Sequence, residues 1–205
     1  MTEKEKGVVT ETKRNIMDAY WDIYTSGLVS KITVKMITNR AGYNRGTFYA
    51  YFLDIEDLHN QIEDELLPSE ESFAKLREAT FSKNSKEIIE LFMKEDKVSG
   101  EKVSFLLGPN GSLSFQIKLK TKLRELIIKY APLDLKEPEK VIDYKADIVC
   151  SLFYETVHYW YDRGRTLFTG EEMINLMMKI IFFGVTEGED LKKQLILKKQ
   201  LKGRI

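Results

Sequence analysis

The stretch that decides the fold is TVKMITNRAGYNRGTFYAYF, residues 33–52. Thr33 can cap a helix, because a threonine side chain accepts a hydrogen bond from a free amide of the first turn. Gly42 stands where a backbone with positive φ often ends a helix. Between them, apolar residues at spacings of three and four share one inward face: Val34, Ile37 and Ala41. The first half of the stretch therefore predicts a short helix that ends at Gly42.

The second half predicts another short helix, with side chains suited to DNA. Asn44 can cap it, and Phe48 and Phe52, four residues apart, are its apolar anchors. The residues beside these anchors are Arg45, Gly46, Thr47, Tyr49 and Tyr51. A helix, a glycine turn and a second such helix form a helix-turn-helix, whose second helix enters the major groove of DNA. Gly46, with no side chain, would let that helix approach the DNA closely.

This block resembles the DNA-binding segment of the TetR/AcrR family of bacterial transcriptional regulators. The residues that match the family pattern are Thr33, Val34, Ile37, Ala41, Gly42, Tyr43, Gly46, Thr47, Phe48, Tyr49 and Phe52. The matches outside the block are Thr12, Ile16, Ala19 and Gly27, which fit the family's first helix, and Leu58, which fits the start of its fourth. The resemblance implies a homodimer that binds a pseudo-palindromic operator as a repressor and is controlled by a small-molecule effector.

The chain also departs from the family pattern. Ile55 stands where the family usually has a lysine, Tyr51 replaces a usual histidine, and Thr38 replaces a common alanine. A lysine at position 55 could meet a DNA phosphate, so its loss removes one phosphate contact and the counterion release that accompanies it. This departure favours an alternative function, a TetR-like coactivator or adaptor whose helical domain binds another protein instead of a metabolite.

Charge and cysteine content narrow the class of protein. The 205 residues carry no formal net charge, which is not typical of a general nucleic-acid binder, but residues 12–52 hold six basic and two acidic residues, a local net charge of +4. Cys150 is the single cysteine, so no intrachain disulfide can form. The N-terminal residues lack the apolar stretch of a signal peptide, and no run is long enough for a membrane span. We therefore expect a cytoplasmic protein without a membrane partner.

Apolar periodicity is helical along the whole chain and predicts an all-α fold with two domains. These are a helix-turn-helix DNA-binding domain, residues 8–54, and a larger helical effector-binding and dimerisation domain, residues 55–205. The first helix is expected at residues 12–26, and the fourth from about Asp54. The later helices are expected near residues 70–80, 85–94, 103–107, from Ser112 or Ser114, at 139–163, and from Thr169 or Gly170.

The last two of these helices are apolar on more than one side, so each needs more than one partner surface. Two such neighbours predict a two-fold, four-helix dimer interface, with a large monomeric core as the alternative. The predicted interface residues are Val149, Phe153, Val157, Trp160, Met173, Met177, Ile180, Ile181 and Gly184. The basic segment after Asp190 predicts a solvated final helix, with a membrane-surface or nucleic-acid contact as the alternative.

The candidate DNA-binding residues fall into two groups. Arg45, Thr47 and Tyr43 are expected near base edges or thymine methyl groups, with Arg45 the best base reader because a guanidinium can bind guanine through two hydrogen bonds. The residues expected at the DNA backbone are Lys13, Thr33, Asn44, Tyr49 and Tyr51, and Gly46 lies among them. Alternatively, Thr33 and Asn44 are helix caps, and Tyr43 and Tyr49 pack the hairpin.

Aromatic residues in the second domain could line a pocket for a small apolar or aromatic effector, or belong to the core: Phe92, Phe105, Phe115, Tyr154 and His158. Enzyme chemistry finds little support. Cys150 and His158 share one predicted helix and lie about 12 Å apart along its axis, too far for a nucleophile–base pair. The sequence shows no zinc-ligand motif and no glycine-rich phosphate loop, so we predict no enzyme activity, cofactor or metal.

Overall fold

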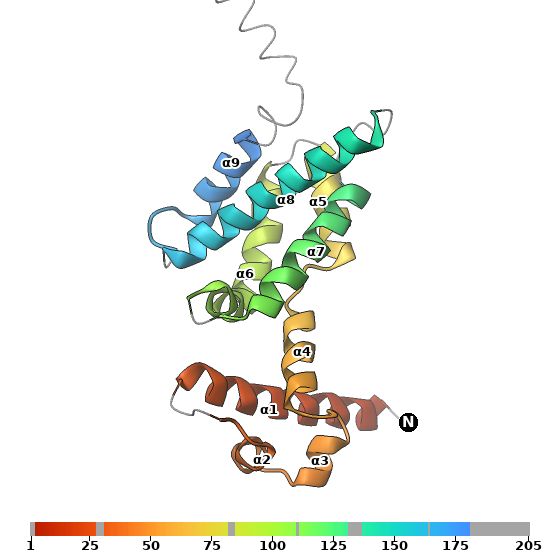
Figure 1. Cartoon of the computed structure of the whole chain (residues 1–205), viewed down its shortest axis with the longest axis vertical. Helices are drawn as coiled ribbons and strands as arrows, with labels where there is room; N and C mark the ends of the chain where they lie inside the picture. The colour runs from red at the N-terminus through yellow and green to blue at the C-terminus, as the bar shows by residue number, and fades with distance from the viewer. Residues whose placement is uncertain are drawn as a thin grey trace, which may run out of the picture. The chain divides into compact units, whose positions relative to one another are not determined.

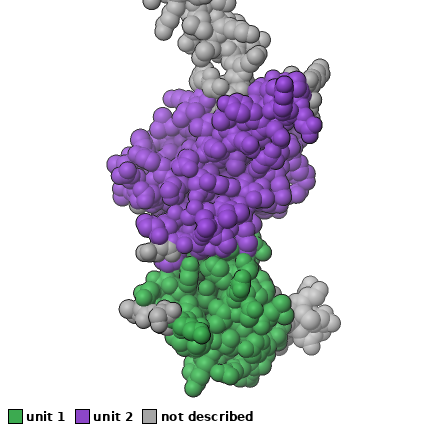
Figure 2. All heavy atoms as spheres, in the orientation of Figure 1, with its two compact units in different colours: residues 1–66 green, residues 67–205 purple. Residues whose placement is uncertain are grey.

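The computed structural model describes residues 3–27, 31–81, 85–109, 111–130, 137–163 and 165–180. Throughout these ranges the regular elements are α-helices, which confirms the predicted all-α fold (Figure 1). The chain divides into two compact units, Met1–Leu66 and Leu67–Ile205 (Figure 2). The helices of the first unit are α1 (Glu3–Ser26), α2 (Val34–Ala41), α3 (Arg45–Tyr49) and α4 (Ile55–Glu65).

The ends of these helices lie where the sequence signals predict them. The Thr33 side chain accepts a hydrogen bond from the Met36 amide, and the Asn44 side chain accepts one from the Thr47 amide. Gly42 follows α2 with φ of 75°, a left-handed conformation that costs glycine no steric strain. α1 begins at Glu3, earlier than expected at Thr12, and the intervening glutamates and lysines are good helix formers.

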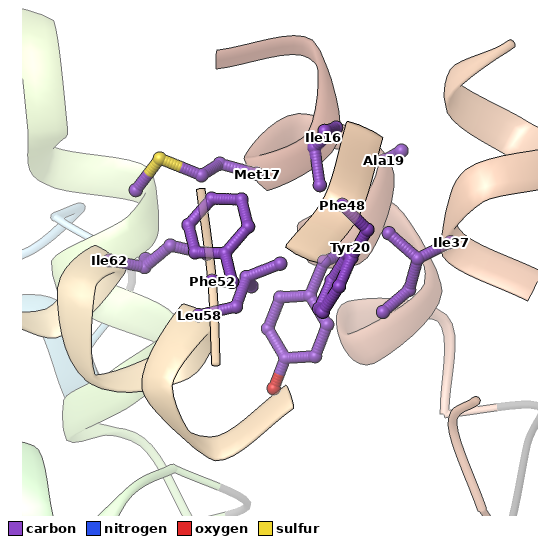
Figure 3. Packing of buried hydrophobic residues seen from close by; sticks show 9 residues of the cluster. All are labelled: Ile16, Met17, Ala19, Tyr20, Ile37, Phe48, Phe52, Leu58 and Ile62. Carbon is purple, nitrogen blue, oxygen red and sulfur yellow. The ribbon is translucent and has the colours of Figure 1, made fainter. Parts of the chain in front are cut away.

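A single apolar core joins the four helices of the first unit (Figure 3). Its buried members are Ile16, Met17, Ala19, Tyr20, Ile37, Phe48, Phe52, Leu58 and Ile62. Leu58 and Ile62 come from α4, so this helix completes the first core. The first unit therefore extends through α4, whereas the division predicted from the sequence lies before it, between residues 54 and 55.

The second unit contains α5 (Glu70–Phe81), α6 (Ser85–Leu107), α7 (Leu113–Tyr130), α8 (Glu139–Asp162) and α9 (Gly170–Ile180). α6 is one continuous helix, so the prediction of two separate pieces is wrong. The polar middle of α6 is held by close packing: Gly100 is buried, and a side chain there would collide with Asp96. Asp96 in turn accepts a hydrogen bond from the Tyr161 hydroxyl at 2.9 Å, which ties α6 to α8.

α8 contacts α6, α7 and α9 and is the central helix of this unit (Figure 1). Ala146, Val149 and Trp160 bury one side of α8. On the side toward α7, Arg124 contacts Asp143 and Asp147, each at 2.7 Å. These carboxylates are exposed, so the buried apolar side contributes more to the stability of the unit than the ion pairs do.

Candidate DNA-binding surface

The short helix α3 presents one face to the core and the opposite face to solvent. Phe48 is fully buried and contacts Phe52, with ring centroids 5.4 Å apart. Arg45 and Gly46 are exposed, and so is Tyr49, at 57% of its surface. Five residues cannot form a stable helix alone, so the anchor at Phe48 and the cap at Asn44 fix the direction of the exposed face.

Gly46 has a local role that the sequence did not reveal. A Cβ at this position would lie 3.1 Å from Asn44 Oδ1, the atom that caps α3. That oxygen accepts hydrogen bonds from the Thr47 amide at 2.9 Å and from Thr47 Oγ1 at 3.3 Å. A side chain at Gly46 would therefore crowd the cap of α3, whether or not DNA is bound.

The basic residues of the first unit differ in how far their charges are already paired. Lys13 lies 3.5 Å from Glu65 of α4, and Arg40 lies 2.8 Å from Asp22 of α1. In contrast, four exposed basic residues have no ion-pair partner within the described ranges: Arg14, Lys31, Lys35 and Arg45. The structure thus places the predicted DNA contact Lys13 against a carboxylate, and gives Arg45 no ion-pair partner among the described residues.

Two of the candidate tyrosines are partly buried, and each is tied to a neighbouring helix. The ring of Tyr43 packs against the first core, and Asn15 Nδ2 donates to its hydroxyl at 3.2 Å. Tyr51 also packs against this core, and its carbonyl accepts a hydrogen bond from Gln61 Nε2 at 3.5 Å. Sequence spacing gave no sign of either partner.

The start of α4 carries a carboxylate cluster instead of the family's lysine. Ile55 is half-buried and packs against the first core, so its side chain serves the fold and offers no charge. Asp54 caps α4 by accepting a hydrogen bond from the Asp57 amide at 2.8 Å. The Leu53 amide donates to Asp57, and this bond, followed by those from Gln61, holds the pKa of the Asp57 carboxyl below its ordinary value.

A polar chain inside the first unit connects α1 to α4. The Tyr20 hydroxyl lies 2.9 Å from His59 Nδ1, and His59 Nε2 lies 3.0 Å from Oε1 of Glu63, which is fully buried. Burial raises the pKa of the Tyr20 hydroxyl, with smaller contributions from Tyr24 and Glu63, so this group stays protonated. His59 and Glu63 lie four residues apart and therefore share one face of α4. This spacing was the only feature of the sequence that indicated the polar contacts from Tyr20 through His59 to Glu63.

In the second unit, the residues predicted to line an effector pocket do not all contact one another. Tyr154 and His158 stack, with centroids 5.9 Å apart, and the Tyr154 hydroxyl donates to Gln116 Oε1 at 3.2 Å. Phe92 instead contacts Trp160, with centroids 5.7 Å apart. Phe115 is fully buried on α7, and Phe105 is half-buried on α6. Lys120, which sequence reasoning missed, places its Nζ 4.1 Å from the Tyr154 ring centroid.

Four of the nine residues predicted for a dimer interface lie in the core of a single chain. The buried ones are Val149, Trp160, Met173 and Met177. Phe153 and Val157 are half-buried and Ile180 is exposed, whereas Ile181 and Gly184 lie outside the described residues. The large apolar side chains that α8 and α9 expose are Tyr144, Ile148, Tyr159, Leu176 and Ile180.

Cys150 and the metal-binding residue types show no arrangement for chemistry. Cys150 is buried and its thiol donates to the Lys120 carbonyl at 3.5 Å, and burial raises the pKa of the thiol. A neutral buried thiol is not a nucleophile. In the part of the chain that the structure describes, no three His, Cys, Asp or Glu side chains gather as a metal site. None of the helices described there has the length and apolar character needed to cross a membrane.

The helical arrangement is similar to solved structures. A TetR transcriptional regulator from Streptococcus agalactiae 2603V aligns over 86% of this chain and 97% of its own, with a TM-score of 0.60 and 20% identity. The dihydroxyacetone kinase operon activator DhaS aligns over 85% of this chain and 96% of its own, with a TM-score of 0.47 and 17% identity. No protein-family model matches the sequence, and no curated protein matches it. The chain has the fold of TetR-type transcriptional regulators.

Proposed function

We propose that the chain is a transcriptional regulator that binds a pseudo-palindromic DNA operator as a homodimer and represses transcription in the cytoplasm until a small-molecule effector releases it. The observation that carries the proposal is the exposed face of α3. On that face, Arg45 and Tyr49 lie four residues apart and are both exposed. The buried side chain of Phe48 anchors the helix to the core on its other side. Arg45 is exposed and has no ion-pair partner among the described residues, so its guanidinium is free to meet DNA.

Arg45 is the proposed base reader, since a guanidinium can donate two hydrogen bonds to guanine O6 and N7. Thr47, in the first turn of α3, would contact base edges or thymine methyl groups, whereas Tyr43, in the turn before α3, would contact the DNA backbone. Lys31 and Lys35, exposed and without ion-pair partners in the described ranges, add the cationic surface that phosphates attract. Such phosphate contacts position the protein, whereas Arg45 would determine sequence.

The proposed dimer interface is the exposed apolar surface of α8 and α9. On α8, Tyr144 and Ile148 lie four residues apart and Tyr159 follows eleven residues after Ile148, so all three fall on one stripe. Leu176 and Ile180 of α9 are also four residues apart. Burying this surface against the same surface of a second copy would remove apolar area from water and pair two DNA-binding units. Recognition helices of such a dimer would lie about one DNA turn apart.

The proposed effector site involves the Tyr154 and His158 pair of α8, where two stacked rings offer apolar faces with polar edges. An effector that binds one arrangement of the second unit more tightly would shift the population toward that arrangement. α4, the last helix of the first unit, would carry the change to α3 through its buried contacts. Effector binding and DNA binding would then weaken each other by the same factor.

The test begins with selection of duplexes from a random-sequence pool by the full chain. We expect enrichment of a two-fold symmetric site, and we expect Arg45→Ala to lose affinity for it by about tenfold or more while folding and dimerisation persist. Lys86→Ala, an exposed basic residue of α6, is the matched control and should bind as the wild type does. Unchanged binding by Arg45→Ala would show that α3 is not the base reader.

The same experiment distinguishes a sequence-specific regulator from the alternative function, a protein-binding adaptor. An adaptor would enrich no sequence and would bind selected and random duplexes equally at moderate salt, because only a sequence reader keeps a large specificity ratio. The half-buried position of Ile55 accounts for the missing lysine through packing. That departure from the family pattern therefore no longer favours an adaptor.

A further inference from the structure

We propose that Asn15 is a positioning residue for DNA binding, which holds the Tyr43 hydroxyl so that its proton is donated to a DNA phosphate oxygen. The inference rests on the proposed function and adds to it a residue outside the helix-turn-helix. Asn15 lies on α1, and Tyr43 lies in the turn between α2 and α3, 28 residues later. The two groups meet at the surface, with Asn15 Nδ2 donating to Tyr43 Oη at 3.2 Å.

The position of Tyr43 makes its hydroxyl suitable for this role. Its ring is partly buried and packs against the first core, which limits how far the ring can turn. Its oxygen remains at the surface, where the hydrogen bond from Asn15 is exposed. An aromatic side chain with an apolar body and a polar tip is suited to such a boundary. Tyr43 therefore presents a fixed hydroxyl at the start of the proposed recognition helix.

The direction of the hydrogen bond determines which ligand the hydroxyl can bind. A phenol has one proton to donate and lone pairs to accept with. Because the Asn15 amide donates, it occupies a lone pair of Tyr43 Oη and leaves the proton for an acceptor. Phosphate oxygens only accept hydrogen bonds, and a donor that is itself hydrogen-bonded is polarised and binds more strongly. No other side chain of the described residues bonds to this hydroxyl.

α1 supports the helix-turn-helix at a second point on the same face. Asp22 lies seven residues after Asn15, two helical turns along, and accepts hydrogen bonds from Arg40 at the end of α2. One face of α1 therefore holds both the last turn of α2 and the turn that follows it. A hydroxyl fixed before binding loses less conformational freedom when it meets DNA, and this preorganisation increases affinity.

The test uses a short mixed-sequence duplex, since phosphate contacts do not depend on sequence and no operator is needed. Fluorescence anisotropy of the full chain over a series of KCl concentrations would compare the wild type with Asn15→Ala, Tyr43→Phe and the double variant. We expect each single variant to bind about 3- to 10-fold more weakly, which corresponds to the net contribution of one ordinary hydrogen bond. The double variant should lose no more than Tyr43→Phe alone, because both changes remove the same interaction.

Two further measurements distinguish positioning from a general loss of structure. The slope of log affinity against log salt should stay unchanged in all three variants, because no cation is removed. Asn15 is exposed on a helix, where alanine is favourable, so the melting temperature of Asn15→Ala should match that of the wild type. Tyr130→Phe is the matched control: it removes a tyrosine hydroxyl that makes a hydrogen bond of the same length, 3.2 Å, in the second unit, and should not change duplex binding.

The outcomes separate this inference from the proposed function. Failure of the wild type to bind any duplex would overturn both. A wild type that binds, together with an unaffected Asn15→Ala, an unaffected Tyr43→Phe or additive losses in the double variant, would overturn the role of Asn15 alone. Equal weakening in the single variants without a further loss in the double variant would support it.

Discussion

The Asp57 carboxylate of α4 accepts a hydrogen bond from the Leu53 amide, 2.8 Å away, in the turn that follows the proposed recognition helix. Gln61, one helical turn later, donates to both oxygens of this carboxylate at 3.2 Å and to the Tyr51 carbonyl at 3.5 Å. Two side chains of α4, those of Asp57 and Gln61, therefore form hydrogen bonds with the backbone segment that follows α3. A movement of α4 would carry this turn with it, which is the coupling that the proposed effector response needs.

This contact makes part of the stability depend on pH. The Leu53 amide and then Gln61 favour the charged carboxylate, so the folded pKa of Asp57 lies below its ordinary value of 3.8. A depressed pKa contributes stability that is present above the unfolded value and is lost as pH falls through the folded pKa. We expect Asp57→Asn to melt at a lower temperature than the wild type at neutral pH. That gap should shrink as pH falls below 3.8.

Thermal melting monitored by circular dichroism at a series of pH values would test this pH dependence. Glu56→Gln removes a carboxylate from the same turn, and Glu56 has no hydrogen-bond partner within the described ranges, so it should lower the melting temperature less. A gap between Asp57→Asn and the wild type that is constant from neutral to strongly acidic pH would show that the charge of Asp57 does not contribute.

Neighbouring residues of α3 should respond very differently to truncation. Phe48 is fully buried, so Phe48→Ala leaves a cavity and should lower the free energy of unfolding of the first unit by about 3–5 kcal/mol. Tyr49 is 57% exposed, and Tyr49→Ala should change the free energy of unfolding by less than about 1 kcal/mol. Urea unfolding of both variants would test the assignment of inner and outer faces. Similar losses in the two variants would contradict it.

Local signals in the sequence predicted much of the first unit. The caps at Thr33 and Asn44 join groups only three residues apart, and the turn at Gly42 depends on the conformational freedom of a single residue. Such features depend on short-range geometry, which spacing reveals. Partners far apart in the chain could not be found in this way. Asn15 meets Tyr43 across 28 residues, and only the folded core brings them together.

The second unit shows a different limit of sequence periodicity. The most regular apolar stripe of α8 was assigned to the dimer, but Val149 and Trp160 of that stripe are buried in the chain's own core. Ile148 and Tyr159, which lie off the stripe, are exposed. Periodicity shows that a helix has two apolar sides, but which side the chain covers depends on the other helices. The continuity of α6 was missed for a related reason, because Gly100 breaks the pattern yet permits close packing.

The exposed stripe of α8 gives a direct test of the proposed dimer. Ile148→Glu places a charge in the centre of this stripe, where burial against a second copy would leave the carboxylate without water. We expect the wild type to show twice the chain mass by light scattering, and the variant to dissociate at least about tenfold more readily. Val98→Glu is the matched control, because Val98 is 81% exposed on α6 and does not belong to the proposed interface. Equal dimerisation of the two variants would place the interface elsewhere.

The ion pair between Asp22 and Arg40 should limit how strongly the first unit binds DNA of any sequence. The two charges are 2.8 Å apart and both side chains are 54% exposed, so the pair contributes at most about 1 kcal/mol of stability. Asp22→Asn should therefore leave the melting temperature nearly unchanged while it releases Arg40. If Arg40 then meets a phosphate, affinity for a mixed-sequence duplex rises and the salt slope steepens by about 0.9.

Glu11→Gln is the control for this experiment, since it removes the same charge from α1 at an exposed position with no ion-pair partner in the described part of the chain. Glu11→Gln should raise the affinity for the duplex slightly, because it makes the electrostatic potential of the first unit more positive. It should leave the slope of log affinity against log salt unchanged, because no side chain gains a phosphate contact. A steeper slope for Asp22→Asn alone would identify Arg40 as a cation held back by its partner. Equal slopes in the two variants would show that Arg40 does not reach the DNA even when it is free.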